Sequence, residues 1–415
     1  MPYNNSINWG LGIPINVDYA DTPNIDAFGR LRVSNPVGVF DTQLTYDLQP
    51  LLYEKIVTGA GASIAHDATN RQGLMTFAST PTGGTAYMQS YQFLRYQPGQ
   101  SLIVLISFNF KGGVANCLKS AGYKSNLNGV QIELNGTAWQ ITLYSGTTLG
   151  NTTIAQASWN LDKMDGTGTS GITLDSTKTQ ILILDFQALY SGRVRVGFDI
   201  GGQYIYCHEF LNSNISLYPY IQTANLPVRV GMTCTATVNT TMTMVCASVM
   251  NEGGIDEIPH YSFSFGSTKT AANGVATYFG SIRPRATFNG ITNRTIFRIV
   301  SIDILVTGNS SVYWQLCVGQ ALTTPTYTAI NATYSAFEGD FTGTLSGTPA
   351  IIIESGYVAA TNGSKSTIST STPIAYPITL DAAGNPRDLG TLTLLVTGIG
   401  GASVMYASLT YSEER

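Results

Sequence analysis

Two glycine-containing turns between runs of alternating residues constrain the fold of this sequence more than any other feature. Asn135-Gly136 divides residues 129–144, and Gly201-Gly202 joins residues 193–200 to residues 203–210. Such dipeptides favour β-hairpins, because the two-residue turns that match the twist of paired strands need positive φ. The two hairpins therefore predict antiparallel sheets.

Alternation along a hairpin predicts which side chains share a face, since strand neighbours point to opposite sides. With Asn135-Gly136 as the loop, Leu134 is predicted to pair with Thr137, and Ile132 with Trp139. This face is apolar over most of its length. We therefore expect it to face the core.

The second hairpin is predicted to have two unlike faces. One is apolar and faces the core: Val194, Val196, Phe198, Ile200, Ile205 and Cys207. The other carries rings and hydrogen-bonding groups and includes Arg195, Asp199, Tyr204, Tyr206 and His208. A tyrosine offers a flat apolar ring with a polar tip, which suits both subunit contacts and stacking on sugars. Three interpretations stay open for this face: a surface that is solvated or covered by the chain itself, a subunit interface, and a glycan site.

The pattern as a whole predicts an all-β chain with two antiparallel β-sandwich domains. Continuous apolar runs at residues 101–110 and 179–186 predict buried strands, and helical periodicity is nearly absent. The predicted division is an extended N-terminal arm at residues 1–36, a first sandwich at 37–252, a linker at 253–260 and a second sandwich at 261–415. Within the second sandwich, Gly308-Asn309 predicts a third two-residue hairpin.

The arm contains four prolines and no apolar period. Because proline fixes φ and lacks a backbone donor, these residues favour an extended segment. Apolar and basic residues alternate near its end, and the candidate docking residues are Phe28, Arg30, Leu31 and Arg32. They are expected to lie either on the domain of their own chain or on a neighbouring subunit.

Composition narrows the classes of partner. Charged residues make up 11% of the sequence and the net charge is -4, so the chain has no basic field to hold phosphates, and nucleic-acid binding is not expected. Protein or glycan partners are expected instead. The longest aliphatic run, residues 102–106, is too short for membrane insertion, and the N-terminus does not resemble a signal peptide. We expect a soluble chain without an export address of its own.

The five cysteines are widely scattered and form no C-x-x-C pair. This spacing indicates neither a disulfide framework nor a zinc site. It fits folding in a reducing cytoplasm, although a single bridge stays open as an alternative.

Three patterns could carry chemistry. Residues 162–168 place two aspartates before glycines, as a calcium loop would, but a tight turn with aspartates bonded to their own backbone is the simpler interpretation. Cys207-His208-Glu209 cannot form a metal or nucleophile cluster if strand neighbours alternate between faces. Of the candidate glycosidase carboxylates Asp185, Asp199 and Glu209, the last two are predicted to point to opposite faces. We expect no cofactor, no metal and no enzymatic activity.

Several segments resemble a group of virion structural proteins of tailed bacteriophages. They are DAFGRLRVSNP, FDTQLTYDLQP, FLRYQPGQS and the stretch from SWNLDKMDGTG to IYCHEF, and the resemblance covers about residues 25–230. It implies a concanavalin-like or jelly-roll sandwich and brings no catalytic residues with it. The second sandwich is predicted from pattern alone.

The resemblance implies a non-enzymatic component of a bacteriophage virion, made in the host cytoplasm. Its expected partners are other virion proteins of the capsid, neck or tail, which it would decorate or attach to. Copies of the chain are expected to form a homo-oligomer, with a trimer favoured. The alternative is a carbohydrate-binding host-attachment module of the particle, which would bind a host glycan.

Overall fold

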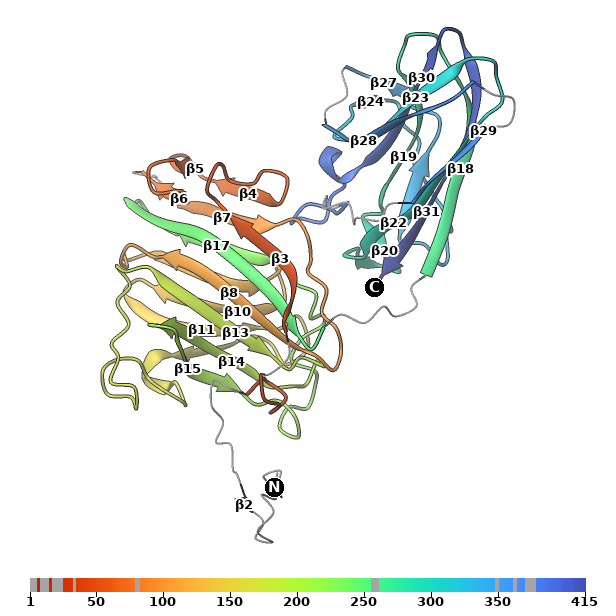
Figure 1. Ribbon diagram of the computed structural model, residues 1–415. Coiled ribbons are helices and arrows are strands. Elements are labelled where there is room, and N and C mark those ends of the chain that lie inside the picture. Colours follow the sequence, from red (N-terminus) through yellow and green to blue (C-terminus); the bar gives the residue numbers. More distant parts are fainter. Residues whose placement is uncertain are drawn as a thin grey trace.

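A computed structural model describes residues 25–32, 35–78, 83–254, 261–347, 351–360 and 378–415, together with the backbone of residues 6–7, 15–16 and 364–369. The sheets are antiparallel, and the helical elements of this part of the chain are two 3-10 turns, Gln156–Ser158 and Asp388–Gly390. The predicted all-β fold class is confirmed. Figure 1 shows two bodies of sheet, one from the first part of the chain and one from the last.

The first sandwich consists of two sheets. One has the strand order β15-β14-β13-β8-β17-β6-β5, with β3 added on β17, and the other has the order β12-β11-β10-β9-β16-β7-β4. We call them the eight-stranded and the seven-stranded sheet. The strands of the first are β3 (Val37–Gln43), β5 (Ala62–Asp67), β6 (Gln72–Phe77), β8 (Ser101–Asn109), β13 (Gln180–Phe186), β14 (Val194–Ile200), β15 (Gln203–Phe210) and β17 (Thr240–Glu252). Those of the second are β4 (Tyr53–Thr58), β7 (Gly84–Ser90), β9 (Cys117–Lys124), β10 (Gly129–Asn135), β11 (Ala138–Tyr144), β12 (Thr152–Ala155) and β16 (Val228–Cys234).

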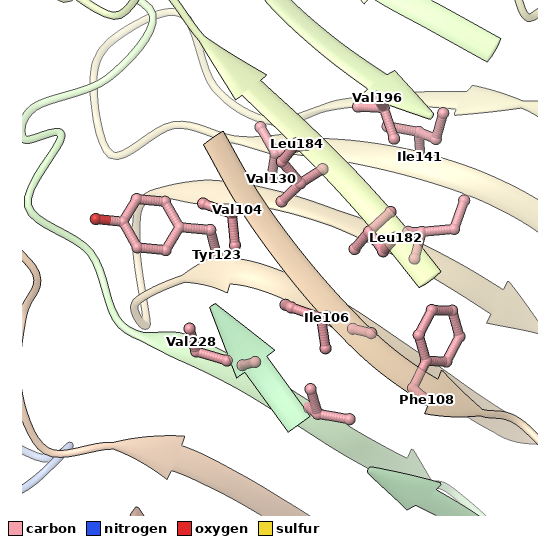
Figure 2. Packing of buried hydrophobic residues seen from close by; sticks show 14 of the residues in the cluster. Val104, Ile106, Phe108, Tyr123, Val130, Ile141, Leu182, Leu184, Val196 and Val228 are labelled. Atoms are coloured by element: carbon pink, nitrogen blue, oxygen red, sulfur yellow. The ribbon is translucent and has the colours of Figure 1, made fainter. Parts of the chain in front are cut away.

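The core of this sandwich lies between the inner faces of the two sheets. Strand β8 pairs with β13 and β17 and contributes Val104, Ile106 and Phe108, all fully buried. Figure 2 shows these side chains packed with residues of the facing sheet, among them Val130 and Ile141. The predicted buried strands at residues 101–110 and 179–186 are confirmed.

The two predicted hairpins exist, but only one has the predicted register. Gly201-Gly202 is the loop between β14 and β15, and both glycines have positive φ. In the other hairpin Asn135 pairs with Ala138, so the loop is Gly136-Thr137 and the predicted register is wrong by two residues. Gly136 alone supplies positive φ at the first loop position, as in a type II′ turn. A shift by two keeps the same side chains facing the core.

The second sandwich packs a four-stranded sheet against a six-stranded one, with orders β18-β31-β22-β29 and β25-β26-β19-β30-β23-β28. Its main strands are β18 (Tyr261–Ala271), β19 (Thr277–Pro284), β22 (Ile296–Val306), β23 (Ser311–Val318), β26 (Phe337–Asp340), β28 (Ile351–Val358), β29 (Ser364–Ser369), β30 (Leu392–Ile399) and β31 (Ser403–Glu414), and β25 (Thr328–Ala329) is short. Strands β22 and β23 belong to different sheets. The predicted hairpin at Gly308-Asn309 is therefore wrong, because this turn carries the chain across the sandwich.

Each sandwich has its own cluster of buried apolar residues. Between them, residues 255–260 of the predicted linker lie outside the described part of the chain. One contact between the two sandwiches is made by a loop of the second one, and another is the ion pair of Arg95 with Glu414 of β31 at 3.4 Å. The backbone amide of Ala382 donates to Glu54 at 2.8 Å, and Asn126 donates to the carbonyl of Ala382 at 3.0 Å. The guanidinium of Arg387 lies 3.6 Å from the ring centre of Tyr91.

One disulfide joins Cys117 of β9 to Cys234 of β16. These residues are directly opposite each other in the ladder. The structure therefore contains the single disulfide bridge that the sequence had left open. Cys207, Cys246 and Cys317 carry free thiols.

The packing of β13 gives a matched pair of substitutions. Leu182 is fully buried in the core, whereas its neighbour Ile181 points to the outer face and is 40% exposed. Leu182→Ala is expected to lower the free energy of unfolding of the first sandwich by about 2 to 5 kcal/mol. Ile181→Ala should lower it by less than about 1 kcal/mol. Urea unfolding of both variants measures this, and equal losses would contradict the assignment of the inner face.

Candidate functional site

A β-bulge in β15 changes which residues lie on the predicted outer face of the second hairpin. Val196 pairs with His208 and Gly197 with Tyr206, so Cys207 is the extra residue. Residues directly opposite each other share a face, and His208 therefore lies on the side of Val196 rather than on the predicted outer face. The same bulge places Glu209, which pairs with Arg195, on the outer face. Alternation without the bulge gave the opposite result for both residues.

A buried carboxylate organises what remains of the predicted face. Asp185 of β13 is fully buried. Its carboxylate accepts hydrogen bonds from the hydroxyl of Tyr206 at 3.0 Å and from that of Ser101 at 2.9 Å. It also pairs with the guanidinium of Arg195, which is fully buried as well. The Arg195 guanidinium lies 4.2 Å from the ring centre of Tyr206. Burial, followed by the negative charge of Asp185, raises the pKa of Tyr206. The phenol therefore stays protonated and donates to the carboxylate.

The end of the N-terminal arm lies on this same group. Arg32 donates to Asp185 at 2.6 Å and to Glu252 at 2.7 Å, and Arg195 donates to the carbonyl of Ile25 at 2.7 Å. The backbone amide of Ala27 donates to Ser101. The arm residues and the outer-face residues that the sequence singled out separately thus meet, and they meet within one chain.

The other predicted docking residues have lesser roles in this contact. Arg30 pairs with Asp26 at 2.8 Å and lies 4.9 Å from the ring centre of Phe28. Leu31 is 43% exposed. Residues 1–24 lie outside the part of the chain whose side chains are described, so the arm's interpretation as a segment that docks on a neighbouring subunit stays a prediction.

Asp199 and Tyr204 lie further along the same outer face, where they pair with each other across the hairpin. Asp199 accepts a hydrogen bond from the backbone amide of Gly202 and so stabilises the turn. The guanidinium of Arg32 lies 5.8 Å from the ring centre of Tyr204. The arm therefore reaches across this end of the face as well.

Cys207, His208 and Glu209 do not form a reactive cluster. Burial raises the pKa of the Cys207 thiol, which donates to the carbonyl of Val196. Burial lowers the pKa of His208 to about 4, so the imidazole is neutral at pH 7 and accepts a hydrogen bond from the backbone amide of Asn160. Glu209 pairs with the guanidinium of Arg193 at 3.5 Å. The three side chains therefore contact other groups rather than one another.

The paired-carboxylate interpretation fails on distance. Asp199 and Glu209 do share the outer face, contrary to the prediction, but Glu209 pairs four residues away along β14. At the usual rise of a strand this is roughly 13 Å. Glycosidase carboxylates stand about 5 to 9.5 Å apart. Asp185 is fully occupied by its ion pairs.

The aspartate–glycine segment at residues 162–168 is a tight turn. The carboxylate of Asp162 accepts hydrogen bonds from the backbone amides of Met164 and Ser170. That of Asp165 accepts one from the backbone amide of Thr167. Gly166 supplies positive φ. The interpretation as backbone-bonded aspartates is confirmed. Across the described ranges, no group of three or more His, Cys, Asp or Glu side chains could hold a metal ion, and no helix is long and apolar enough to cross a membrane.

A second polar surface, which was not predicted from the sequence, lies on the outer face of the seven-stranded sheet. Its members are Tyr87 and Gln89 of β7, Arg229 of β16, Ser120 and Lys124 of β9, Gln131 and Glu133 of β10, and Gln140, Thr142 and Tyr144 of β11. We call this the polar face. Five strands contribute to it, and their alternate residues point into the core.

Glycines shape the middle of the polar face. Gly231 and Gly122 stand at interior positions of β16 and β9. A Cβ atom on Gly231 would lie 2.5 Å from the ring of Tyr87, and one on Gly122 would lie 2.8 Å from the side chain of Gln131. The ring and the amide therefore lie flat over the sheet only because these positions lack side chains.

Glu133 sits at the centre of the polar face and is only 1% exposed. It accepts hydrogen bonds from Gln140 at 2.7 Å, from Thr142 at 2.7 Å and from the hydroxyl of Tyr144. Burial, and then the charge of Glu133, raises the pKa of Tyr144. The network fixes the tyrosine ring in one orientation.

Two cations lie against the tyrosine rings. The ammonium of Lys124 is 4.1 Å from the ring centre of Tyr144, and the guanidinium of Arg229 is 4.6 Å from that of Tyr87. Lys124 reaches its ring across Gly129, which separates β9 from β11 in the ladder and has no side chain to block it. Rings, amides and cations thus form one ordered surface.

A signal for the polar face exists in the sequence. Gln131, Glu133, Gln140, Thr142 and Tyr144 alternate with the apolar residues of the first hairpin. Half of this face can be found from that alternation. The other half lies on β7, β9 and β16, which are far apart in the sequence. These residues can be placed on one face only when the pairing of these strands is known.

No protein-family model matches the sequence, and no curated protein matches it. Solved structures with a similar fold include the carbohydrate esterase of the Shiga toxin-encoding bacteriophage phi24B, with 11% identity, coverage of 52% of this chain and 99% of that chain, and a TM-score of 0.31. A Bacillus licheniformis β-glucanase has 11% identity, coverage of 51% and 98%, and a TM-score of 0.33. A glycosyl hydrolase family protein from Mycobacterium fortuitum has 12% identity, coverage of 51% and 99%, and a TM-score of 0.35.

These neighbours contradict the prediction that the chain has no enzymatic activity, because they are themselves an esterase and glycoside hydrolases. Enzymatic activity is therefore no longer excluded for this chain, and no particular activity is assigned to it. Similarity at this level assigns neither a substrate nor a reaction to this chain. The jelly-roll type of β-sandwich is supported, whereas membership of a phage virion family stays a prediction.

The Asp185 group predicts a large effect of one substitution. Asp185→Asn leaves the buried guanidinium of Arg195 without its charge partner, and the free energy of unfolding is expected to fall by about 3 to 5 kcal/mol. Asp199→Asn on the same outer face removes a carboxylate that has a turn hydrogen bond, and a change below about 0.5 kcal/mol is expected. Denaturant unfolding compares the two, and a small effect of Asp185→Asn would refute the role of this ion pair.

Proposed function

We propose that this chain is a carbohydrate-binding component of a tailed-bacteriophage particle. The polar face of the seven-stranded sheet is its binding surface. The observation that carries the proposal is that this face holds two ordered tyrosine rings and a set of hydrogen-bonding side chains over glycine positions of a sheet. Sugars present apolar C–H faces and hydroxyl groups at once, so they suit rings beside amides and charged groups.

The face is organised before any ligand arrives. Tyr87 and Tyr144 are held by Thr233 and Glu133 through their hydroxyl groups, at 3.1 Å for the first pair. Gln131 is only 3% exposed, and its amide donates to the carbonyl of Arg229. Ordering these side chains adds little entropic cost on binding, which favours affinity for a flexible saccharide.

The particle assignment rests on the sequence resemblance and on the arm. The segments that resemble virion proteins include the arm residues that dock on Asp185. Because residues 25–32 are held on this chain, residues 1–24 are the part of the arm that we assign to contact with another virion protein. Chain copies would then be placed on the particle with the polar face available to a host glycan.

Tyr87→Ala tests the binding surface. On a glycan array, the wild-type chain is expected to bind at least one class of saccharide, and the variant should lose that signal about tenfold or more, as interface aromatic residues typically do. Gln131→Ala is the second variant and should also weaken binding, because it removes a hydrogen-bonding amide while it keeps both tyrosine rings. Tyr46→Ala is the matched control, since Tyr46 is 84% exposed and lies outside the polar face.

Thermal melting of each variant excludes unfolding as the cause of lost binding. Equal binding by wild type and by both polar-face variants would refute this surface. Release of soluble sugar from a bound polysaccharide, measured in parallel, decides whether the chain also cleaves what it holds.

Deletion of residues 1–24 tests the particle assignment. The deletion leaves the contacts of Arg32 with Asp185 and Glu252 in place, so the melting temperature is expected to stay unchanged. Incorporation into particles, measured in a complementation assay, should be lost. Normal incorporation of the shortened chain would count against a role of this segment in assembly.

A further inference from the structure

A group of exposed apolar side chains lies at one end of the first sandwich, beside the arm. They belong to the loop between β13 and β14 and to the segment that follows β15. The members are 43 to 84% exposed: Leu189, Tyr190, Leu211, Ile215, Leu217 and Tyr218. We call this group the apolar patch. Single apolar side chains are common on protein surfaces, whereas a contiguous group of them marks an interaction site.

Hydrogen bonds hold these two loops side by side. The backbone amide of Tyr220 donates to the carbonyl of Tyr190 at 2.9 Å, and the side chain of Asn212 donates to the carbonyl of Gly192 at 2.8 Å. Asn212 and Tyr220 are themselves buried, so they anchor the loops to the sandwich. The apolar patch is therefore presented by a backbone that the fold holds in place.

The turn that carries Leu189 and Tyr190 has a strained backbone. Ala188, Leu189 and Tyr190 have φ values of 40°, 44° and 57°, and none of them is a glycine. Residues with a Cβ atom are disfavoured in this left-handed region, and they visit it as single residues rather than in runs. Strain of this kind clusters at functional sites. Ala188 is buried while the next two side chains point to solvent, so the strained turn presents apolar groups instead of hiding them.

A hollow of about 350 Å³ connects the apolar patch with the end of the arm. It is lined by Leu211 and Ile215 of the patch and by residues 27–29 of the arm. The charged member of its lining, Arg193, pairs with Glu209 at 3.5 Å. The patch thus continues into the surface on which the arm docks, and it suits an apolar, uncharged partner.

The sequence of the arm before this contact predicts a second apolar surface. Apolar residues stand at every second position from residue 7 to residue 19: Ile7, Trp9, Leu11, Ile13, Ile15, Val17 and Tyr19. The residues between them are Asn, Gly, Pro and Asp. The expectation that the arm has no apolar period is therefore wrong for residues 7–19. In an extended segment this alternation places all the apolar side chains on one side, which gains free energy by being covered.

The described end of the arm lies next to the apolar patch. Arg195 donates to the carbonyl of Ile25, and residues 27–29 line the hollow beside the patch. Residues 20–24 can span roughly 17 Å when extended, so residues 7–19 can reach beyond their own sandwich.

We propose that residues 7–19 of one copy of the chain dock on the apolar patch of a second copy. The inference rests on the proposed particle assignment, in which residues 1–24 contact another virion protein, and it names that protein as a further copy of this chain. Each copy then carries one arm segment and one apolar patch. Contacts of this head-to-tail kind repeat from copy to copy and can close into a ring.

Sedimentation velocity of the full chain over a range of concentrations measures this association. The wild type is expected to form oligomers as its concentration rises. Trp9→Ser alters the arm segment, and the double variant Ile215→Ser/Leu217→Ser alters the two most exposed members of the patch. Each should weaken association about tenfold or more, because apolar contact area is lost. Tyr357→Ser is the matched control, since Tyr357 is 73% exposed and lies on β28 of the second sandwich.

An equimolar mixture of the two defective proteins separates the kinds of contact. The Trp9→Ser chain keeps an intact patch and the double variant keeps an intact arm segment, so the mixture should form pairs that neither protein forms alone. Wild-type association of the Trp9→Ser chain would overturn the inference, because two patches that meet each other need no arm. A wild-type chain that stays monomeric at every concentration would overturn it too, as expected if the segment covers the patch of its own chain.

Incorporation into particles keeps this inference apart from the proposed function. Both defective proteins should be lost from particles, as the chain without residues 1–24 is expected to be. Incorporation that needs residues 1–24 but tolerates Ile215→Ser/Leu217→Ser would overturn the docking between copies and leave the particle assignment standing. Melting temperatures equal to that of the wild type, measured below the onset of association, exclude unfolding as the cause of lost association.

Discussion

The ion pair between Asp185 and Arg195 is the interaction on which the arrangement of the first sandwich depends. Both side chains are fully buried on the outer face of the eight-stranded sheet. A buried charge must be paired, and this pair is completed by Arg32 from the arm. The chain thereby covers one outer face with its own N-terminal segment. The polar face of the seven-stranded sheet is instead organised by Glu133, which accepts hydrogen bonds from Gln140, Thr142 and Tyr144.

The sequence predicted the fold class because alternation and turn glycines are local signals. Gly201-Gly202 gave the correct loop, since both positions need positive φ and only glycine adopts it freely. Gly136-Thr137 differed from the prediction because a type II′ turn needs a single glycine. Gly308-Asn309 looks the same in sequence as a hairpin turn, yet it joins strands of different sheets. Turn chemistry sets a local bend and leaves the partner strand undetermined.

The candidate site was predictable only in part. The outer-face residues Arg195 and Tyr206 and the arm residue Arg32 were identified from the sequence, but their common partner Asp185 was considered only as a catalytic carboxylate. The bulge at Cys207 reversed the faces of His208 and Glu209, and a bulge leaves no mark in an alternating sequence. The polar face needed the pairing of β9 with β16, which are about one hundred residues apart. Long-range pairing is what local pattern cannot supply.

The central claim is that the polar face holds a saccharide, and a structure of the chain with a bound oligosaccharide tests it most directly. The account predicts sugar density on the polar face, against the rings of Tyr87 and Tyr144. Saccharide bound on another surface, with the polar face free of it at saturating ligand, would contradict the account.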